Sequence, residues 1–254
     1  MNRSLPLLMS ALLALPSMAA DRGYVEVEGG RFRSSVKYEE SVDAIDVATF
    51  EMMARPVSNA EFAAFVKQHP QWRRDRVPAL LSGPGYLSNW QSADAPGDAL
   101  EPDAPAVQVT WYAADAYCRQ QGARLPTFLE WEYAASADAT RPDARGDVRW
   151  RMQQLQDGTP HAIDAARDAA PNFHGLYQMH GAIWEWSEDF SSLMAGTDRR
   201  GDEDGDRTQF CGATALAFND RDQYATVKRF AILSALRAGN TLGNLGFRCA
   251  RSQP

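Results

Sequence analysis

The residues with the most reactive side chains in this sequence are three cysteines, Cys118, Cys211 and Cys249. Cys211 lies in the stretch FCGATALAFNDR, which follows an aspartate-rich segment. A cysteine becomes a nucleophile where a cation or a base lowers its pKa and a further group orients it. None of the histidines stands at a recognisable Cys/His spacing; they are His69, His161, His174 and His180. We therefore favour a structural role for Cys211, at a tight turn or in a disulfide.

A cluster of aspartates in the sequence DEDGD has the residue types of a metal site. Asp202, Asp204 and Asp206 alternate like the first ligands of an EF-hand loop. Such a loop needs glycine at its sixth position for a sharp turn, and the residue there is Arg207. We interpret the cluster as a solvated acidic loop.

The first residues predict the compartment of these thiols. Residues 1–19 combine one arginine, a largely apolar run and a small-residue end, which is the pattern of a secretory signal peptide. The run has no polar face, which disfavours an uncleaved amphipathic anchor. Cleavage is expected after Ala19 or Ala20, and residues 20–254 form a single exported domain. In an oxidising compartment at most two of the three cysteines can pair with each other.

Length and charge exclude several classes of function. The 254 residues include 26 basic and 33 acidic side chains, a net charge of −7 at pH 7. An acidic chain offers no electrostatic footprint for nucleic acid and little for anionic lipid. No later segment approaches a run of apolar residues long enough for a membrane span. A chain of this length can bury a core without disulfides.

Short elements joined by irregular segments are expected to position the site residues. Three helices are predicted from capping residues and apolar faces, in SNAEFAAFVKQHP, TWYAADAYCRQQG and PTFLEWEYAAS. Ser58 with Glu61, and Thr127 with Glu130, have the spacing of capping boxes. Alternating pieces such as YVEVEGGRF and FRCAR predict strands. The expected fold class is α+β with low regular secondary structure.

Two segments, 70–105 and 195–208, are predicted to be long surface loops because they are rich in turn-forming residues. A long loop without regular structure on a compact domain is usually functional. Trp72, Tyr86 and Trp90 of the first loop are therefore expected to form an exposed contact surface.

Three motifs carry a resemblance to a known family. They are PAVQVTWYAADAYCRQQGARLPTFLEWEYAA (105–135), GLYQMHGAIWEWSEDF (175–190) and NLGFRCA (244–250). In order and spacing they resemble the formylglycine-generating enzyme (sulfatase-modifying factor) family, over nearly the whole mature chain. The resemblance implies a variant of the C-type lectin fold with much irregular structure. Trp184 and Trp186 of the middle motif are expected in its core.

The resemblance also implies where a catalytic site would lie. Active members oxidise a substrate cysteine to formylglycine with oxygen, and they use a cysteine pair that binds copper(I), a metal suited to soft thiolate ligands. Laying CGATALAFNDR on the family's Gly-Gly-Ser turn places the two cysteine positions near Leu216 and Arg221. Residues 212–248 contain no cysteine. The prediction is that the chain is not an enzyme, because this pair is absent.

The resemblance implies one disulfide. In the family the cysteines that match Cys118 and Cys249 pair with each other, which leaves Cys211 as the odd thiol. The competing prediction joins Cys211 to Cys249. Peptide mapping under non-reducing conditions distinguishes the two pairings.

A structural calcium site is a further implication of the resemblance. The ligands carried over are the side chain of Gln178, the backbone carbonyls of Gly181 and Ile183, and Glu185. The family usually has Asn or Asp at the position of Gln178, and the longer side chain supplies the same kind of oxygen from a different distance. The alternative role for Glu185 is to cap local backbone amides. A second family calcium site has no match within 150–172.

Within the family the chain resembles a branch of periplasmic accessory proteins in which FCGxxA replaces the active-site turn. One kind of member acts upstream of a kinase in the threonine-phosphorylation control of type VI secretion, and another is associated with nitrite reductase. Length and signal peptide favour the first kind. The chain is therefore expected to be a periplasmic, non-catalytic regulatory protein. Its expected partner is a protein, such as the sensor domain of a membrane kinase.

The alternative is a metal-dependent enzyme with altered chemistry, as in relatives that mature siderophores or form carbon–sulfur bonds with iron. Iron would need a facial set of histidine and carboxylate ligands. The four scattered histidines show no such grouping.

Overall fold

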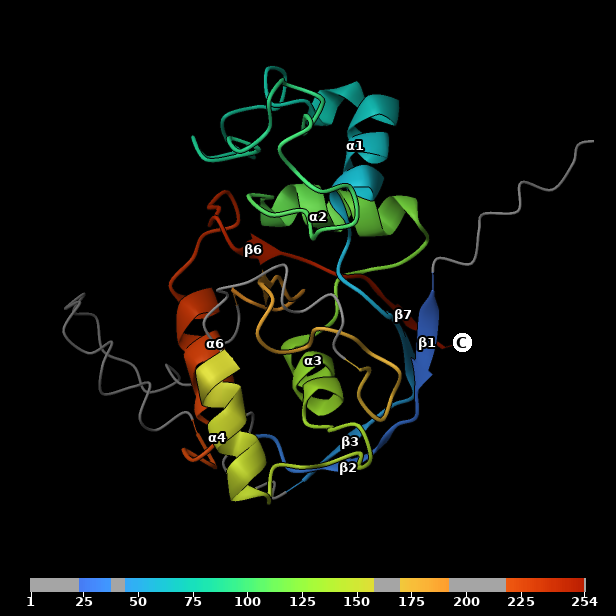
Figure 1. Ribbon diagram of the computed structural model, residues 1–254, viewed down its shortest axis with the longest axis vertical. Coiled ribbons are helices and arrows are strands. Elements are labelled where there is room, and N and C mark those ends of the chain that lie inside the picture. Colours follow the sequence, from blue (N-terminus) through green and yellow to red (C-terminus); the bar gives the residue numbers. More distant parts are fainter. Residues whose placement is uncertain (1–22, 38–43, 158–169, 192–217, 254) are drawn as a thin grey trace, which may run out of the picture.

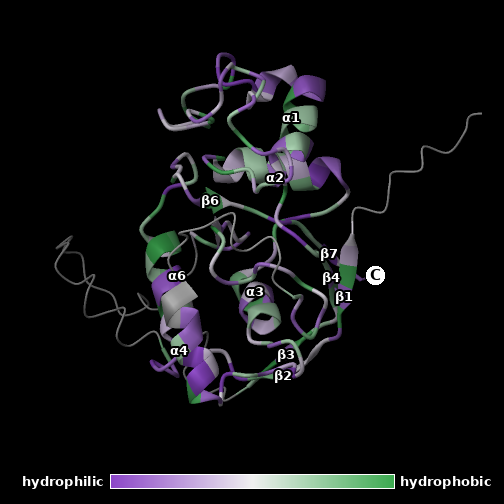
Figure 2. Ribbon diagram, in the orientation of Figure 1, coloured by the Kyte–Doolittle hydropathy of each residue, from purple (hydrophilic) through white to green (hydrophobic). Residues whose placement is uncertain are grey.

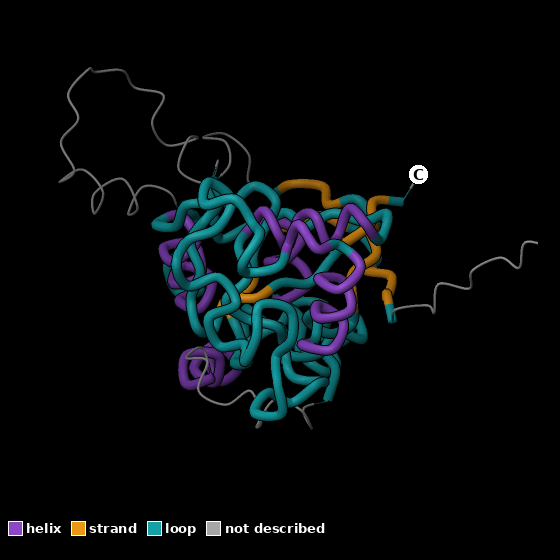
Figure 3. Tube along the Cα trace, turned by 90° about the horizontal axis from the view of Figure 1, so that it is seen from above, coloured by secondary structure: helices purple, strands orange, loops and turns teal. Residues whose placement is uncertain are grey.

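A computed structural model describes residues 23–37, 44–157, 170–191 and 218–253. Irregular segments connect its short helices and strands (Figure 1 and Figure 3). The strands are β1 (Tyr24–Val27), β2 (Gly30–Phe32), β3 (Ile45–Val47), β4 (Phe50–Met53), β5 (Trp184–Glu185), β6 (Leu245–Gly246) and β7 (Ala250–Ser252). The helices are α1 (Asn59–Gln68), the short 3-10 helix η1 (Pro70–Trp72), α2 (Trp111–Gln120), α3 (Phe128–Ala135), α4 (Val148–Asp157) and α6 (Tyr224–Ser234). This mixture confirms the predicted α+β class with modest regular structure.

Strands from both ends of the chain form the main sheet. β4 pairs antiparallel with β1 on one side and with β7 on the other. β2 pairs antiparallel with β3, and β5 pairs parallel with β6, which places Glu185 opposite Gly246. The carboxyl-terminal segment therefore contacts both the main sheet and the motif that begins at Gly175 (Figure 1).

The three predicted helices are present and begin at the predicted caps. The Ser58 hydroxyl accepts the N–H of Glu61, and the Glu61 carboxylate accepts the N–H of Ser58. Thr127 and Glu130 form the same arrangement at α3. These side chains satisfy backbone donors that have no partner within the helix. None of the helices in the described ranges is long and apolar enough to cross a membrane.

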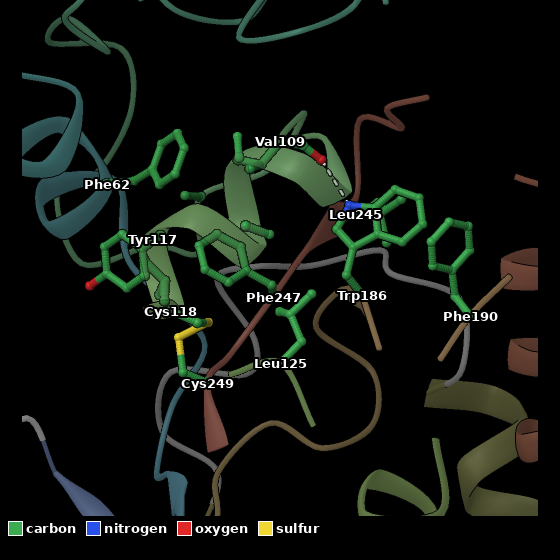
Figure 4. Packing of buried hydrophobic residues seen from close by; sticks show 14 of the residues in the cluster. Phe62, Val109, Tyr117, Cys118, Leu125, Trp186, Phe190, Leu245, Phe247 and Cys249 are labelled. Atoms are coloured by element: carbon green, nitrogen blue, oxygen red, sulfur yellow. Dashed lines mark hydrogen bonds between the residues drawn. A yellow bond between two sulfur atoms is a disulfide. The ribbon is translucent and has the colours of Figure 1, made fainter. Parts of the chain in front are cut away.

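The larger hydrophobic core lies between α1, α2 and the carboxyl-terminal segment (Figure 4). Phe62 and Tyr117 pack against Phe247, with ring centroids 5.9 and 5.3 Å apart. Beside these rings Cys118 and Cys249 form a disulfide, and both side chains are fully buried (Figure 4). The structure thus has the pairing that the family resemblance implies.

A second hydrophobic cluster joins the main sheet to α3. Phe50 and Met52 of β4 pack with Trp131 and Ala134. On the other side of the molecule α4 packs beside α6, and hydrophilic residues make up most of α4 (Figure 2). The helix α3 is therefore fixed by apolar contacts, whereas α4 covers the outside.

The segment 70–105 is irregular apart from η1, but its aromatic side chains point inward. Tyr86 and Trp90 are 2% and 3% exposed, so the expectation that they form an exposed contact surface is wrong. The Tyr86 hydroxyl donates to the Trp72 carbonyl at 2.9 Å, and the Arg74 guanidinium donates to the Trp90 carbonyl at 3.0 Å. Trp72 is half-buried against the same core. The rings pack on α1, and side chains satisfy backbone groups that have no strand or helix partner.

Candidate functional site

The motif GLYQMHGAIWEW forms a loop that leads into β5. Three of its residues have left-handed backbone conformations: Gly175 has a φ of 81°, Gln178 a φ of 59° and Gly181 a φ of 84°. Glycine adopts this conformation freely, whereas a residue with a side chain does so only where packing holds it. Trp186 is fully buried, as predicted, and its indole donates to the Val109 carbonyl at 2.9 Å (Figure 4). Trp184 is half-buried instead.

Glu185 of this motif forms a fully buried ion pair with Arg248. Two nitrogens of the Arg248 guanidinium, Nε and Nη2, donate to different oxygens of the carboxylate at 2.8 Å, and both side chains are 0% exposed. The Trp131 indole donates to Oε2 of Glu185 at 3.0 Å. Arg248 also donates to the Tyr177 carbonyl at 2.9 Å. One carboxylate therefore joins the motif, α3 and the carboxyl-terminal segment.

The sequence does not predict Arg248 as a site residue. The only signal for it in the sequence is its place in the GFRC motif, directly before Cys249. Its partners are far away along the chain, so a local pattern could not identify the ion pair. Glu185 contacts these side chains rather than local backbone amides.

Three of the predicted calcium ligands belong to the motif loop and Glu185 belongs to β5, and their oxygens differ in availability. Among the described residues no hydrogen bond reaches the carbonyls of Gly181 or Ile183, or the side-chain amide of Gln178. Oxygens without protein donors suit a hard cation. Glu185 is different, because the charge of Arg248 offsets that of its carboxylate. Three of the four predicted oxygens are therefore without a protein donor among the described residues, whereas both oxygens of the Glu185 carboxylate are already paired.

The predicted catalytic positions fall mostly outside the described residues. Cys211 and Leu216 lie there, and so do His161 and the acidic cluster at 202–206. Arg221 is described and lies in an exposed turn before α6.

Histidines and carboxylates do not gather into a metal site within the described ranges. No group of three or more His, Cys, Asp or Glu side chains that could hold a metal ion occurs there. His180 makes a hydrogen bond through Nε2 with the Ala135 carbonyl at 2.8 Å. Burial lowers the pKa of His174, which favours its neutral form.

A second buried carboxylate, that of Glu132 on α3, holds the segment after β2. It accepts hydrogen bonds from the Ser34 hydroxyl and, at 2.7 Å, from the Ser35 backbone N–H. Burial raises the pKa of Glu132, and these hydrogen bonds together with the Arg145 charge oppose that rise. Its role is therefore to connect elements inside the fold.

A surface groove of about 700 Å³ lies beside the motif loop, a volume typical of ligand sites. The Arg55 guanidinium lies over the Tyr177 ring, 3.8 Å from its centroid, and Asp103 is exposed. The groove thus presents both a positive and a negative charge. Its lining includes Met53, Ala54, Arg55, Ser58, Asp103 and Gln178.

The three sequence motifs meet at the Glu185 carboxylate, which contacts Trp131 and Arg248, and comparison with known proteins assigns them to one family. The family described as the sulfatase-modifying factor enzyme 1-like domain matches residues 14–253. The chain belongs to this family.

Relatives in the family differ in the activity that their names state. The formylglycine-generating enzyme of Streptomyces coelicolor is 29% identical over 283 residues, which cover 90% of this chain and 89% of the relative. The inactive C-alpha-formylglycine-generating enzyme 2 of Mus musculus is 27% identical over 305 residues, covering 97% and 92%. The hercynine oxygenase of Mycolicibacterium thermoresistibile is 32% identical over 173 residues, covering 59% and 37%. Similarity therefore assigns the family but not an activity.

Proposed function

We propose that this chain is an exported, non-catalytic accessory protein that binds a protein partner in the periplasm. The observation that carries this proposal is the absence of cysteine from residues 212–248, where the resemblance places the copper-binding pair. Copper(I) bound by two thiolates cannot form without that pair. The inactive relative from Mus musculus is compatible with a non-catalytic role.

The process proposed is the threonine-phosphorylation control of type VI secretion. Chain length, the predicted signal peptide and the FCGxxA turn support accessory proteins of the TagR kind, which act upstream of a membrane kinase. A strain without this chain is expected to lose kinase-dependent activation of secretion. The Cys211→Ala chain should restore activation, and a chain without residues 2–19 should not. Restoration by the chain without residues 2–19 would contradict the proposal, and a selective loss of nitrite reduction would point to the other kind of accessory protein.

The groove beside the motif loop is the surface proposed for the partner. Asp103→Arg is expected to weaken binding of the purified kinase sensor domain about tenfold, which corresponds to about 1.4 kcal/mol, because it reverses an exposed charge of the groove. Asp98→Arg makes the same change at an exposed residue outside the groove lining and is the control. Equal affinity of both variants, measured by calorimetry, would place the contact elsewhere.

We also propose that calcium binds the motif loop. The oxygens would come from Gln178, Gly181 and Ile183, and Glu185 would be a fourth ligand whose charge is neutralised. The bound ion would stabilise the conformation of the loop. Arg248 neutralises the Glu185 carboxylate, so the site offers calcium no net negative charge. The expected affinity is therefore weak, with a Kd of about 10⁻⁴–10⁻³ M. At a calcium concentration 100 times the Kd, the free energy of unfolding should rise by about 2.7 kcal/mol.

Thermal unfolding with calcium, magnesium or a chelator measures this effect. Gln178→Ala should reduce the response to calcium, whereas Gln153→Ala, at an exposed position of α4, should not. A chain whose stability is the same in calcium and in chelator would rule out the site.

The second candidate function is a metal-dependent oxidase or maturation enzyme with altered chemistry. The similarity to a hercynine oxygenase over 59% of this chain favours it. Metal content of the protein from its native host separates the two candidates. Calcium alone supports the binding protein, and stoichiometric copper or iron supports the enzyme.

A further inference from the structure

The side chain of Arg229, on α6, is buried without a hydrogen-bond acceptor among the described residues. It is 1% exposed, and Nε, Nη1 and Nη2 are all without a partner. A guanidinium carries five N–H donors, and a buried charge without acceptors is strongly unfavourable. Such a group calls for an acceptor that the described protein atoms do not supply.

An aromatic ring supports the guanidinium from one side. Its central carbon lies 3.8 Å from the centroid of the Trp131 ring and 5.6 Å from that of Phe128. Stacking on a ring stabilises the face of the guanidinium, while the N–H groups point outward in its plane. The aromatic contacts therefore fix the orientation of Arg229 and leave its donors available.

The nearest carboxylates are engaged elsewhere. Glu185 accepts hydrogen bonds from Arg248 and Trp131, and Asp189 accepts the Phe128 N–H at 2.8 Å. Burial lowers the pKa of Arg229 to about 9, and the charges of Glu185 and Asp189 oppose this effect. The side chain is therefore still a cation at pH 7.

A small cavity shares the Trp131 ring with this cation. Its volume is about 20 Å³, and it is lined by Trp131, on which Arg229 lies, and by Ala225, one turn earlier on α6. The half-buried Trp184 also lines it and carries the Lys228 ammonium 5.6 Å from its ring centroid. Two cations thus lie against rings of the same cavity.

We propose that Arg229 is the anchor of a binding site for a carboxylate. A carboxylate accepts two parallel hydrogen bonds from a guanidinium, which a single water does not. The source is either a small free acid or an acidic side chain of a protein partner. The site does not depend on the function proposed above, because it follows from the burial of Arg229 alone.

Thermal unfolding of the mature full-length chain in formate, compared with chloride at equal ionic strength, tests the site. The melting temperature of the unaltered chain is expected to rise saturably with formate, and tryptophan fluorescence to change in parallel because Trp131 lies against Arg229. Arg229→Met should abolish both responses and Arg229→Lys should weaken them. Arg149→Met, at an exposed position of α4, should behave as the unaltered chain.

The stability of Arg229→Met without formate is a second measurement. It should equal or exceed that of the unaltered chain, because an unpaired buried cation is replaced by an apolar chain of similar length. A large loss of stability would mean that Arg229 has a structural partner and would overturn the proposal. An equal response of Arg229→Met and the unaltered chain to formate would overturn it as well.

The source of the carboxylate is distinguished by a second probe, N-acetylglutamate N-methylamide. Saturation at a lower concentration of this probe than of formate assigns the site to an acidic side chain of a partner. Saturation at a lower concentration of formate assigns it to a small free acid.

Discussion

Removing the disulfide through the double substitution Cys118→Ala and Cys249→Ala is expected to lower the free energy of unfolding by about 4–5 kcal/mol. The bond closes a loop with a sequence separation of 131 residues, so its loss greatly increases the freedom of the unfolded chain. It also joins α2 to the segment before β7 within the core that Phe62, Tyr117 and Phe247 form. Denaturant unfolding followed by tryptophan fluorescence measures the change.

Cys211→Ala is the control for this prediction, because Cys211 is expected to be the unpaired thiol. Its free energy of unfolding should equal that of the unaltered chain. A comparable loss in Cys211→Ala, or a peptide that links Cys211 to Cys249 in a non-reducing digest, would contradict the pairing.

Breaking the buried ion pair is expected to have an effect of similar size. Arg248→Met should lower the free energy of unfolding by about 3–5 kcal/mol, because Glu185 would remain as an uncompensated charge in a fully buried site. The substitution also removes the donor to the Tyr177 carbonyl. Calorimetry or denaturant unfolding measures the loss.

Two further variants show whether the loss of stability comes from the unpaired charge or from lost packing. Adding Glu185→Leu to Arg248→Met removes the unpaired charge and should recover most of the loss. Arg251→Met removes a partly exposed side chain that contacts Glu51 at 3.8 Å and lies over the Tyr24 ring, and it should cost only about 1 kcal/mol. If the double variant is as unstable as Arg248→Met, packing rather than charge explains the effect.

Elements with local signals could be predicted from the sequence. Ser58 and Glu61, like Thr127 and Glu130, stand three residues apart, and this spacing alone defines a capping box. The helices therefore begin where the pattern places them. The disulfide and the fold came from the family resemblance, since cysteine spacing alone leaves the pairing open.

Contacts between residues that are distant in sequence could not be predicted from local patterns. Glu185 and Arg248 are 63 positions apart, and Arg229 lies against a ring of α3, so no local pattern could indicate them. The turn-rich composition of their segment wrongly predicts Tyr86 and Trp90 at the surface. Burial depends on tertiary contacts rather than on regular structure, and both rings pack in the core.

We propose that this chain keeps the family's scaffold and lacks the copper chemistry that the resemblance implies for active members. The most direct test is to incubate the mature chain with copper(I), oxygen and a cysteine peptide that the Streptomyces coelicolor enzyme converts, and to measure the peptide by mass spectrometry. The Streptomyces enzyme serves as the positive control. We expect the peptide cysteine to stay unmodified with this chain, and its conversion to formylglycine would contradict the claim.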